Sequence, residues 1–171
     1  MRNKRKISVG EIIRYLFYLD NELSGRRPPE RVLRTGIWYH EKLGFNQPTF
    51  FQKYFKYPNG YRDEHWLVRG VPDRIEERDG RLYVAELKTI RKPTKRRKEK
   101  TIEIGGTQAN IYSWLTGAEE YEVYLYLIPD DRMEVYRFDY DEEKAEQDIR
   151  EGIRIKKELE RFRRELKPSL A

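Results

Sequence analysis

The stretch Gly70–Thr89, GVPDRIEERDGRLYVAELKT, places carboxylates among apolar residues in what the pattern predicts is a β-hairpin. Asp79 and Gly80 favour a two-residue turn, because both residue types tolerate the positive φ that such a turn requires. Counting outward from the turn sets Asp73 directly opposite Glu86. A four-residue loop centred on the same dipeptide would keep this pairing, whereas an odd loop or a bulge would shift it.

Two opposed carboxylates and a lysine then share one face of the hairpin. Directly opposed residues have Cβ atoms about 4.5–5.5 Å apart, and like charges there are destabilising unless a positive group lies between them. Strand side chains alternate, so Glu86 and Lys88 lie on one face and Leu87 on the other. Carboxylate oxygens are ligands that Mg²⁺ accepts in proteins. Each residue alone is consistent with a surface salt bridge, but the combination within apolar arms favours a metal site.

Outside the hairpin, the patterns alternate between helical and strand periods. Ser8 and Glu11 form a capping-box pair that would start the first helix, and Gly44 would end the second. The segment RKPTKRRKEK, residues 91–100, is expected to be a polar loop, with Gly105-Gly106-Thr107 opening the helix after it. The expected order is helices within 8–43, strands 48–57, 64–77 and 81–90, a helix from 105, strands 120–129 and 132–140, and a helix over 141–167. This mixture predicts an α/β fold in which helices flank one central mixed β-sheet, with the last helix packed on the sheet.

The composition bounds the class of protein. The 171 residues carry a net charge of +6 and no cysteine, and 39% of them are charged. The absence of cysteine excludes disulfides, cysteine-ligated zinc and cysteine-ligated iron–sulfur clusters. The sequence shows no signal-peptide pattern and no apolar run long enough for a membrane span. We therefore expect an intracellular, cytoplasmic protein whose basic balance favours a polyanionic partner.

Four sequence elements occur in the order of a known nuclease signature. They are TGIWYH with Gly36 and His40, GVPD with Asp73, the tripeptide Glu86-Leu87-Lys88, and QANIY with Gln108 and Tyr112. With this set the chain resembles the RecB-like PD-(D/E)xK nuclease family, in particular its small single-domain branch related to CRISPR-associated exonucleases. Many members of that branch hold an iron–sulfur cluster on cysteines. This chain has no cysteine, so we expect no such cluster.

The resemblance implies a restriction-endonuclease-like core and a role for each matching residue. It implies a Mg²⁺ or Mn²⁺ ion bound by His40, Asp73, Glu86 and the backbone carbonyl of Leu87. The catalytic residues would be Asp73, Glu86 and Lys88. By the same resemblance, the whole chain, residues 1–171, would be one nuclease domain with N-terminal helices in 8–43, a catalytic core over 48–138 and a C-terminal helix over 141–167.

Two further groups of residues are candidates for DNA contact. The resemblance assigns Gln108 and Tyr112 to holding the DNA and the site, and a spacing of four would put them on one helix face. The basic run after the catalytic strand is interpreted as a phosphate contact made by Lys92, Lys95, Arg96, Arg97 and Lys98. A solvated loop or a localisation signal is the alternative for such a run. The N–H groups of Gly105-Gly106-Thr107 are another candidate for phosphate, and a plain helix start explains them equally well.

The sequence therefore predicts a metal-dependent DNA nuclease, an exonuclease that acts on single-stranded DNA or on DNA ends. Two alternatives stay open: an endonuclease of the same fold, junction-cleaving or restriction-like, and a non-catalytic DNA-binding module. DNA is the expected partner and a membrane is not. A homo-oligomer, a larger recombination or repair complex, association with the nucleoid, and a viral or archaeal source are also left open.

Overall fold

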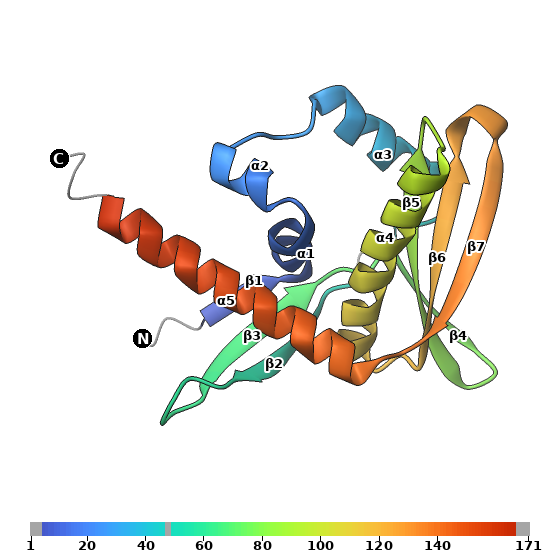
Figure 1. Ribbon diagram of the computed structural model, residues 1–171. Coiled ribbons are helices and arrows are strands. Elements are labelled where there is room, and N and C mark those ends of the chain that lie inside the picture. Colours follow the sequence, from blue (N-terminus) through green and yellow to red (C-terminus); the bar gives the residue numbers. More distant parts are fainter. Residues whose placement is uncertain (1–4, 47–48, 167–171) are drawn as a thin grey trace.

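The chain folds into two mixed β-sheets with helices packed around them, as Figure 1 shows. The computed structural model describes residues 5–46 and 49–166. One sheet has the strand order β1-β3-β2, with β1 and β3 parallel, and the other has the order β4-β5-β6-β7, with β5 and β6 parallel. The elements are β1 (Arg5–Ser8), α1 (Val9–Phe17), α2 (Leu19–Ser24), α3 (Glu30–Lys42), β2 (Phe51–Tyr57), β3 (Glu64–Gly70), β4 (Arg74–Arg78), β5 (Arg81–Ile90), α4 (Lys95–Thr116), β6 (Glu120–Leu127), the short 3-10 helix η1 (Ile128–Asp130), β7 (Arg132–Asp139) and α5 (Glu142–Leu166).

The predicted α/β class is confirmed, but the expectation of a single sheet is wrong. Residues 64–77, expected as one strand, form β3 and β4, which belong to different sheets. The break falls at Val71–Asp73, where Pro72 lacks the N–H group that a strand ladder needs. The sequence prediction also missed β1, a strand of four residues in which only Ile7 is buried. Residues 71–73 form the crossing segment, in which the chain passes from one sheet to the other, and Asp73 therefore lies at the junction of the two sheets.

The predicted hairpin is confirmed. Asp79 and Gly80 have φ angles of 51° and 79°, the pair of positive values that a tight turn of this kind requires. The ladder between β4 and β5 follows the register counted from that turn and reaches Arg74 opposite Ala85. Asp73 therefore lies one residue beyond the ladder, where its backbone groups are free to bind side chains.

The expectation of a loop over residues 91–100 is wrong in its second half, because α4 begins at Lys95. The hydroxyl of Thr94 caps the helix by accepting a hydrogen bond from the Arg97 N–H at 3.2 Å. Lys and Arg favour helices, so a basic run continues a helix once a cap is present. Gly105 and Gly106 lie buried inside α4, so they neither start a helix nor offer free N–H groups to a phosphate.

The N-terminal cap and the C-terminal helix define the helical layer. The Glu11 N–H donates to the Ser8 hydroxyl at 3.0 Å and the Ser8 N–H donates to the Glu11 carboxylate at 3.1 Å, which confirms the capping box. Helix α5 packs on α1 and α4, whereas the sequence interpretation had it on the sheet. Two predicted limits, Pro48 and Lys167, lie outside the described residues.

The contact between α5 and α1 depends on a glycine. A Cβ at Gly152 would lie 2.9 Å from Cγ1 of the fully buried Ile12, which is closer than van der Waals contact. We expect Gly152→Ala to lower the free energy of unfolding by about 1–3 kcal/mol, the usual cost of overpacking. Urea unfolding measures this. Gly36→Ala is the matched control, because nothing lies within 4 Å of a Cβ there. A Gly152→Ala protein at least as stable as the wild type would contradict this packing.

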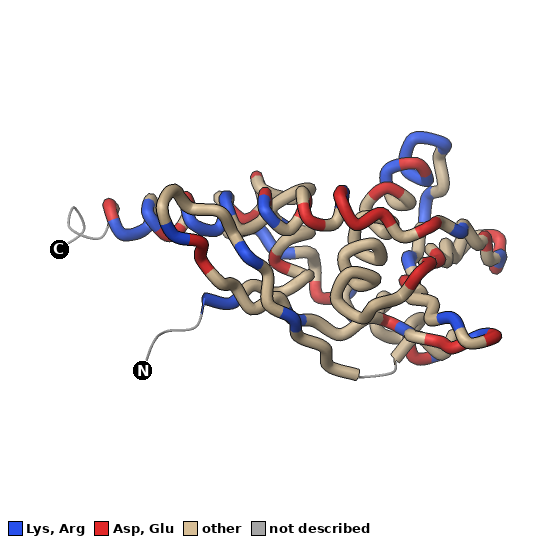
Figure 2. The backbone as a smooth tube through the Cα atoms, turned by 90° about the horizontal axis from the view of Figure 1, so that it is seen from below, with Lys and Arg blue, Asp and Glu red and all other residues tan. Residues whose placement is uncertain are grey.

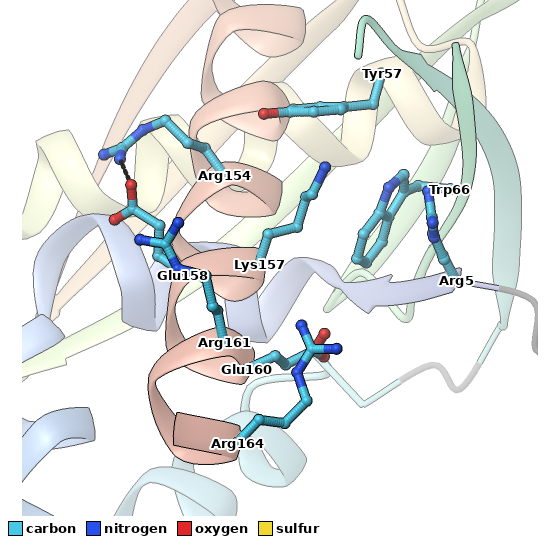
Figure 3. A pocket seen from close by; sticks show the side chains of 9 residues that line it. All are labelled: Arg5, Tyr57, Trp66, Arg154, Lys157, Glu158, Glu160, Arg161 and Arg164. Atoms are coloured by element: carbon cyan, nitrogen blue, oxygen red, sulfur yellow. Dashed lines mark hydrogen bonds and ion pairs between the residues drawn. The ribbon is translucent and has the colours of Figure 1, made fainter. Parts of the chain in front are cut away.

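Charges of both signs are interleaved along the chain, and Figure 2 shows short positive and negative segments mixed with one another and separated by uncharged stretches. A cavity of about 450 Å³ lies between α5 and the three-stranded sheet, and some of the charged side chains that line it form ion pairs inside the fold (Figure 3). Arg5 and Lys157, which line it, are 2.7 and 2.8 Å from Oε1 of the buried Glu64. The indole of Trp66 donates to the other carboxylate oxygen at 3.0 Å. These two cations are therefore bound internally. Within the described ranges, no helix is long and apolar enough to cross a membrane.

The Glu64 cluster predicts a pH dependence of stability. Burial alone would raise the pKa of Glu64, but hydrogen bonds from Lys157 and Trp66 bring that pKa below its ordinary value. A carboxyl group whose pKa is lowered by folding stabilises the fold above its unfolded pKa, and this contribution is lost as the pH falls through the folded pKa. We expect Glu64→Gln to be less stable at pH 7 by about 1–3 kcal/mol and to lose less stability than the wild type on acidification. Urea unfolding between neutral pH and pH 3 measures both, and parallel curves would contradict this.

Candidate active site

Asp73 and Glu86 are joined by hydrogen bonds between backbone and side chain. The Asp73 N–H donates to Oε1 of Glu86 at 3.0 Å, and the Leu87 N–H donates to Oδ2 of Asp73 at 2.9 Å. Glu86 and Leu87 are 1% and 0% exposed on β5. These bonds fix the segment that crosses between the sheets against β5, so the two carboxylates lie in one small, mostly buried site.

His40 reaches this site from α3. Its Nε2 is 3.1 Å from Oδ2 of Asp73, and its Nδ1 is 2.7 Å from the backbone carbonyl of Gly36. A carbonyl oxygen only accepts, so Nδ1 carries the proton in that bond. The hydrogen bond to Asp73 raises the pKa of His40, although burial opposes it. The structure thus brings together His40, Asp73 and Glu86 from three separate elements.

The two carboxyl groups titrate in opposite directions. Burial raises the pKa of Glu86 well above its usual range, and the neighbouring charge of Asp73 raises it further. Burial would also raise the pKa of Asp73, but the hydrogen bond with His40, followed by one with Glu86, leaves that pKa lowered. Ionisation is therefore favoured at Asp73 and disfavoured at Glu86. A cation at this place would reduce the repulsion between the two carboxylates and favour the ionised form of Glu86.

Lys88 lies on the same face of β5 as Glu86 and is half-buried. Its ammonium donates to Oε1 of Gln108 on α4 at 2.7 Å. Gly105 allows this approach, since a Cβ there would lie 3.3 Å from Cγ of Lys88 and 3.0 Å from Val123. The glycine inside α4 thus lets the helix lie close to the strand that carries the lysine.

Tyr112 is placed against the site rather than in open solvent. It is 5% exposed, and a Cβ on Gly70 would lie 2.8 Å from its ring. Gly70 ends β3 just before Asp73, so the ring packs where the chain leaves one sheet for the other. Burial, and then the charge of Glu86, raise the pKa of Tyr112. Of the pair expected to hold the DNA and the site, Tyr112 contacts the crossing segment and Gln108 contacts Lys88.

The basic run lies at the start of α4 and in the segment before it. Four of its five predicted DNA-contact residues are exposed: Lys92, Lys95, Arg96 and Arg97. Lys98 is instead ion-paired with Glu134 of β7 at 2.7 Å. The first turn of α4 contains no acidic residue. The exposed members therefore form a group of positive charges that follows β5 in the chain by a few residues.

Sequence reasoning missed the groove beside the site. A groove of about 540 Å³ lies between α3 and the end of β5, and His40 and Lys88 both line it. The α3 residues Val32, Leu33 and Ile37 form its apolar wall. Their spacing in the sequence places them on one helix face. The same spacing occurs in a helix that packs on a core and in one that lines a groove, so the sequence does not distinguish the two.

A divalent ion suits the donor set, although the donors contact each other rather than surround a common point. Among the residues that the structure describes, no group of three His, Cys, Asp or Glu side chains is arranged as a preformed metal cage. The donors are nevertheless those that hard cations accept, and two carboxyl groups held together in a mostly buried site leave a place for positive charge. The Nδ1–H of His40 is held by a backbone carbonyl, as in metal-bound histidines.

Comparison with known proteins identifies the class of this site. A sequence profile of the PD-(D/E)XK nuclease superfamily matches residues 13–170. The match covers most of the chain, so the protein belongs to the PD-(D/E)XK nuclease superfamily and is a hydrolytic nuclease. The predicted family is thereby confirmed.

A solved structure resembles the chain in fold, and a second is similar to a lower degree. The crystal structure of SSO0001 is 22% identical with a TM-score of 0.55, over 91% of this chain and 78% of that one. An alkaline exonuclease (LHK-Exo) from Laribacter hongkongensis is 14% identical with a TM-score of 0.44, over 96% of this chain and 93% of that one. No curated protein matches the chain.

Proposed function

We propose that the protein hydrolyses phosphodiester bonds in DNA with a divalent cation, Mg²⁺ or Mn²⁺, and acts as an exonuclease on single strands or on DNA ends. The observation that carries this is the buried contact between Asp73 and Glu86, with Lys88 on the same strand face. His40 and the backbone carbonyl of Leu87 would complete the set that holds the cation. When bound, such an ion polarises the scissile phosphate and lowers the pKa of a coordinated water.

The residues of the chain supply the remaining requirements. Lys88 would stabilise the negative charge that develops on the phosphate, or orient the attacking water, while Gln108 fixes its ammonium. His40 would release the proton on Nε2 to bind a cation, and its Nδ1–H would stay on the Gly36 carbonyl. Glu86 would likewise bind the cation as its carboxylate. Cation binding should therefore strengthen as the pH rises, because each of these donors binds metal in its deprotonated form.

The start of α4 would hold the DNA backbone. Lys95, Arg96 and Arg97 lie in the first turn of this helix. The positive end of the helix dipole disfavours cations there and attracts anions, so a phosphate would relieve an unfavourable arrangement. Contacts of this kind are independent of base sequence, and DNA affinity should fall as the salt concentration rises.

A cleavage assay separates this function from its alternatives. End-labelled linear single strands, duplexes and circular single strands are incubated with Mg²⁺, Mn²⁺ or EDTA. The proposal expects linear DNA to be degraded only with a divalent ion and the circle to stay intact. Cleavage of the circle would favour the endonuclease alternative. DNA binding that is equal with EDTA, without cleavage under any condition, would favour the non-catalytic module and overturn the proposal.

A further inference from the structure

Helix α3 carries an apolar face that no part of the described chain covers. None of its described residues is buried, and Val32, Leu33 and Ile37 are 47%, 50% and 60% exposed. These three side chains form the wall of the groove that also contains His40 and Lys88. Apolar side chains left open next to a candidate active site are characteristic of a ligand-binding surface. The groove and the site are therefore continuous.

Gly36 lies in the middle of this wall, and the fold does not require a glycine there. A Cβ at Gly36 would meet no atom within 4 Å, and its φ is not in the left-handed range. A glycine inside a helix is disfavoured relative to alanine. Gly36 lines the groove, so the missing side chain widens the groove next to His40. Space for a ligand explains this residue where packing does not.

The charges next to the groove indicate what kind of ligand it takes. Thr89 lines the groove, and two residues later the Arg91 guanidinium donates to the Thr35 hydroxyl of α3 at 2.9 Å. Lys92, Lys95 and Arg96 follow, and none of them forms an ion pair within the part of the chain that the structure describes. An apolar groove whose lining strand continues in the chain into unpaired cations matches a ligand that joins flat apolar groups to a chain of anions.

An unpaired strand of nucleic acid has this chemistry. Its bases present apolar faces while its phosphates continue along a line of positive charge. A duplex keeps its bases inside the stack, so they are not available to a groove wall. An apolar protein helix would cover the wall but leave the cations without partners. The exposed amide of Asn46, at the groove, would donate to or accept from a base edge.

We propose that the groove between α3 and β5 binds an unpaired base next to the scissile phosphate, and that it makes the enzyme prefer single-stranded ends. This inference rests on the proposed nuclease function and deepens it. The groove holds the base, the start of α4 holds the phosphates that follow, and Lys88 lies between them at the reacting group.

Binding measured without catalysis tests the base-binding groove. Fluorescence anisotropy in EDTA compares a labelled oligothymidine with a strand of the same length in which every base is missing. We expect the wild type to bind the abasic strand about tenfold more weakly, because a base that covers an aliphatic side chain removes enough apolar surface from water for a change of this size. Leu33→Ser should remove most of this difference. Leu23→Ser is the matched control and should keep it, since Leu23 is a leucine of similar exposure, 59%, on α2.

Gly36→Leu gives a second, independent measurement. Its Cβ would meet no atom within 4 Å and leucine favours a helix more than glycine does, so urea unfolding should show equal or greater stability. Binding of oligothymidine should weaken about tenfold, and binding of the abasic strand should not change. If no base binds in the groove, Gly36→Leu should still gain stability, but its affinity for oligothymidine should equal that of the wild type.

Three results would overturn the inference. The first is equal affinity of the wild type for the two strands. The second is a Leu33→Ser protein that keeps the wild-type difference in affinity between them. The third is a Leu33→Ser protein that is a monomer in light scattering where the wild type is a dimer. The last result would make this face an interface between two copies of the chain. Because the binding assay needs no cleavage, a protein that cuts DNA but ignores the bases would refute only this inference. A protein that never cuts DNA would refute the proposed function instead.

Discussion

Glu86→Gln should lose more than about 100-fold in DNA cleavage while keeping its fold. Removing only a hydrogen-bond partner of a metal ligand typically costs roughly 10–100-fold, so loss of the carboxylate itself should exceed that range. Glutamine has nearly the same shape, and it still accepts the hydrogen bond from the Asp73 N–H. The measurement is the single-turnover rate on an end-labelled single strand with Mn²⁺.

The same variant should be at least as stable as the wild type in EDTA at pH 8. The folded pKa of Glu86 is raised, so its contribution to stability is complete below its unfolded pKa and is lost as the pH rises through the folded value. Glutamine at position 86 does not ionise, so the variant does not lose stability in this way as the pH rises. Mn²⁺ at about 100 times its Kd should stabilise the wild type by about 2.7 kcal/mol and should stabilise the variant much less. Equal stabilisation of both proteins would show that the cation binds elsewhere.

Lys88→Ala should lower the maximal cleavage rate by about 100-fold or more, because one charge-stabilising donor in a partly dry site contributes on this scale. Substrate affinity should change little, since the exposed basic residues at the start of α4 hold the phosphates in this account. Lys88→Arg should recover little of the rate. The guanidinium is larger and planar, and it does not reproduce a compact ammonium held at 2.7 Å by Gln108.

Two further variants test whether the loss of cleavage rate in Lys88→Ala is specific to this lysine. Lys144→Ala removes an exposed lysine on α5 that pairs with Asp148, and it should cleave at the wild-type rate. Gln108→Leu keeps Lys88 but removes the acceptor of its ammonium, so a smaller loss, about tenfold, is expected. If Lys88→Ala changed substrate affinity and left the maximal rate unchanged, Lys88 would bind DNA rather than act in the chemical step.

Local chemistry was sufficient to predict the hairpin and the contact it creates. Asp79 and Gly80 fix a turn whose register runs to Arg74 opposite Ala85, and the next residues on the two sides are Asp73 and Glu86, so counting along two strands was enough. The division into two sheets was not predicted, since Pro72 was read as part of a continuous strand although it ends the pairing of β3. The same proline sets the position from which Asp73 reaches Glu86.

Long-range and context-dependent features were less predictable from residues alone. His40 lies 33 positions before Asp73, and only the family resemblance joined them before the fold did. The run 91–100 is polar enough for a loop and has enough good helix formers for a helix, and the Thr94 cap decides between them. The periodicity of α3 gave its apolar face but not its exposure, because periodicity does not distinguish a groove from a core.

The central claim is that the Asp73–Glu86 pair is the catalytic centre of a metal-dependent DNA nuclease. The most direct test compares wild-type protein and Asp73→Ala, purified identically, on an end-labelled single strand with Mg²⁺, Mn²⁺ or EDTA. We expect the wild type to cleave with either cation and not in EDTA, and we expect Asp73→Ala to cleave under none of these conditions. Cleavage that survives the substitution, or that proceeds in EDTA, would contradict it.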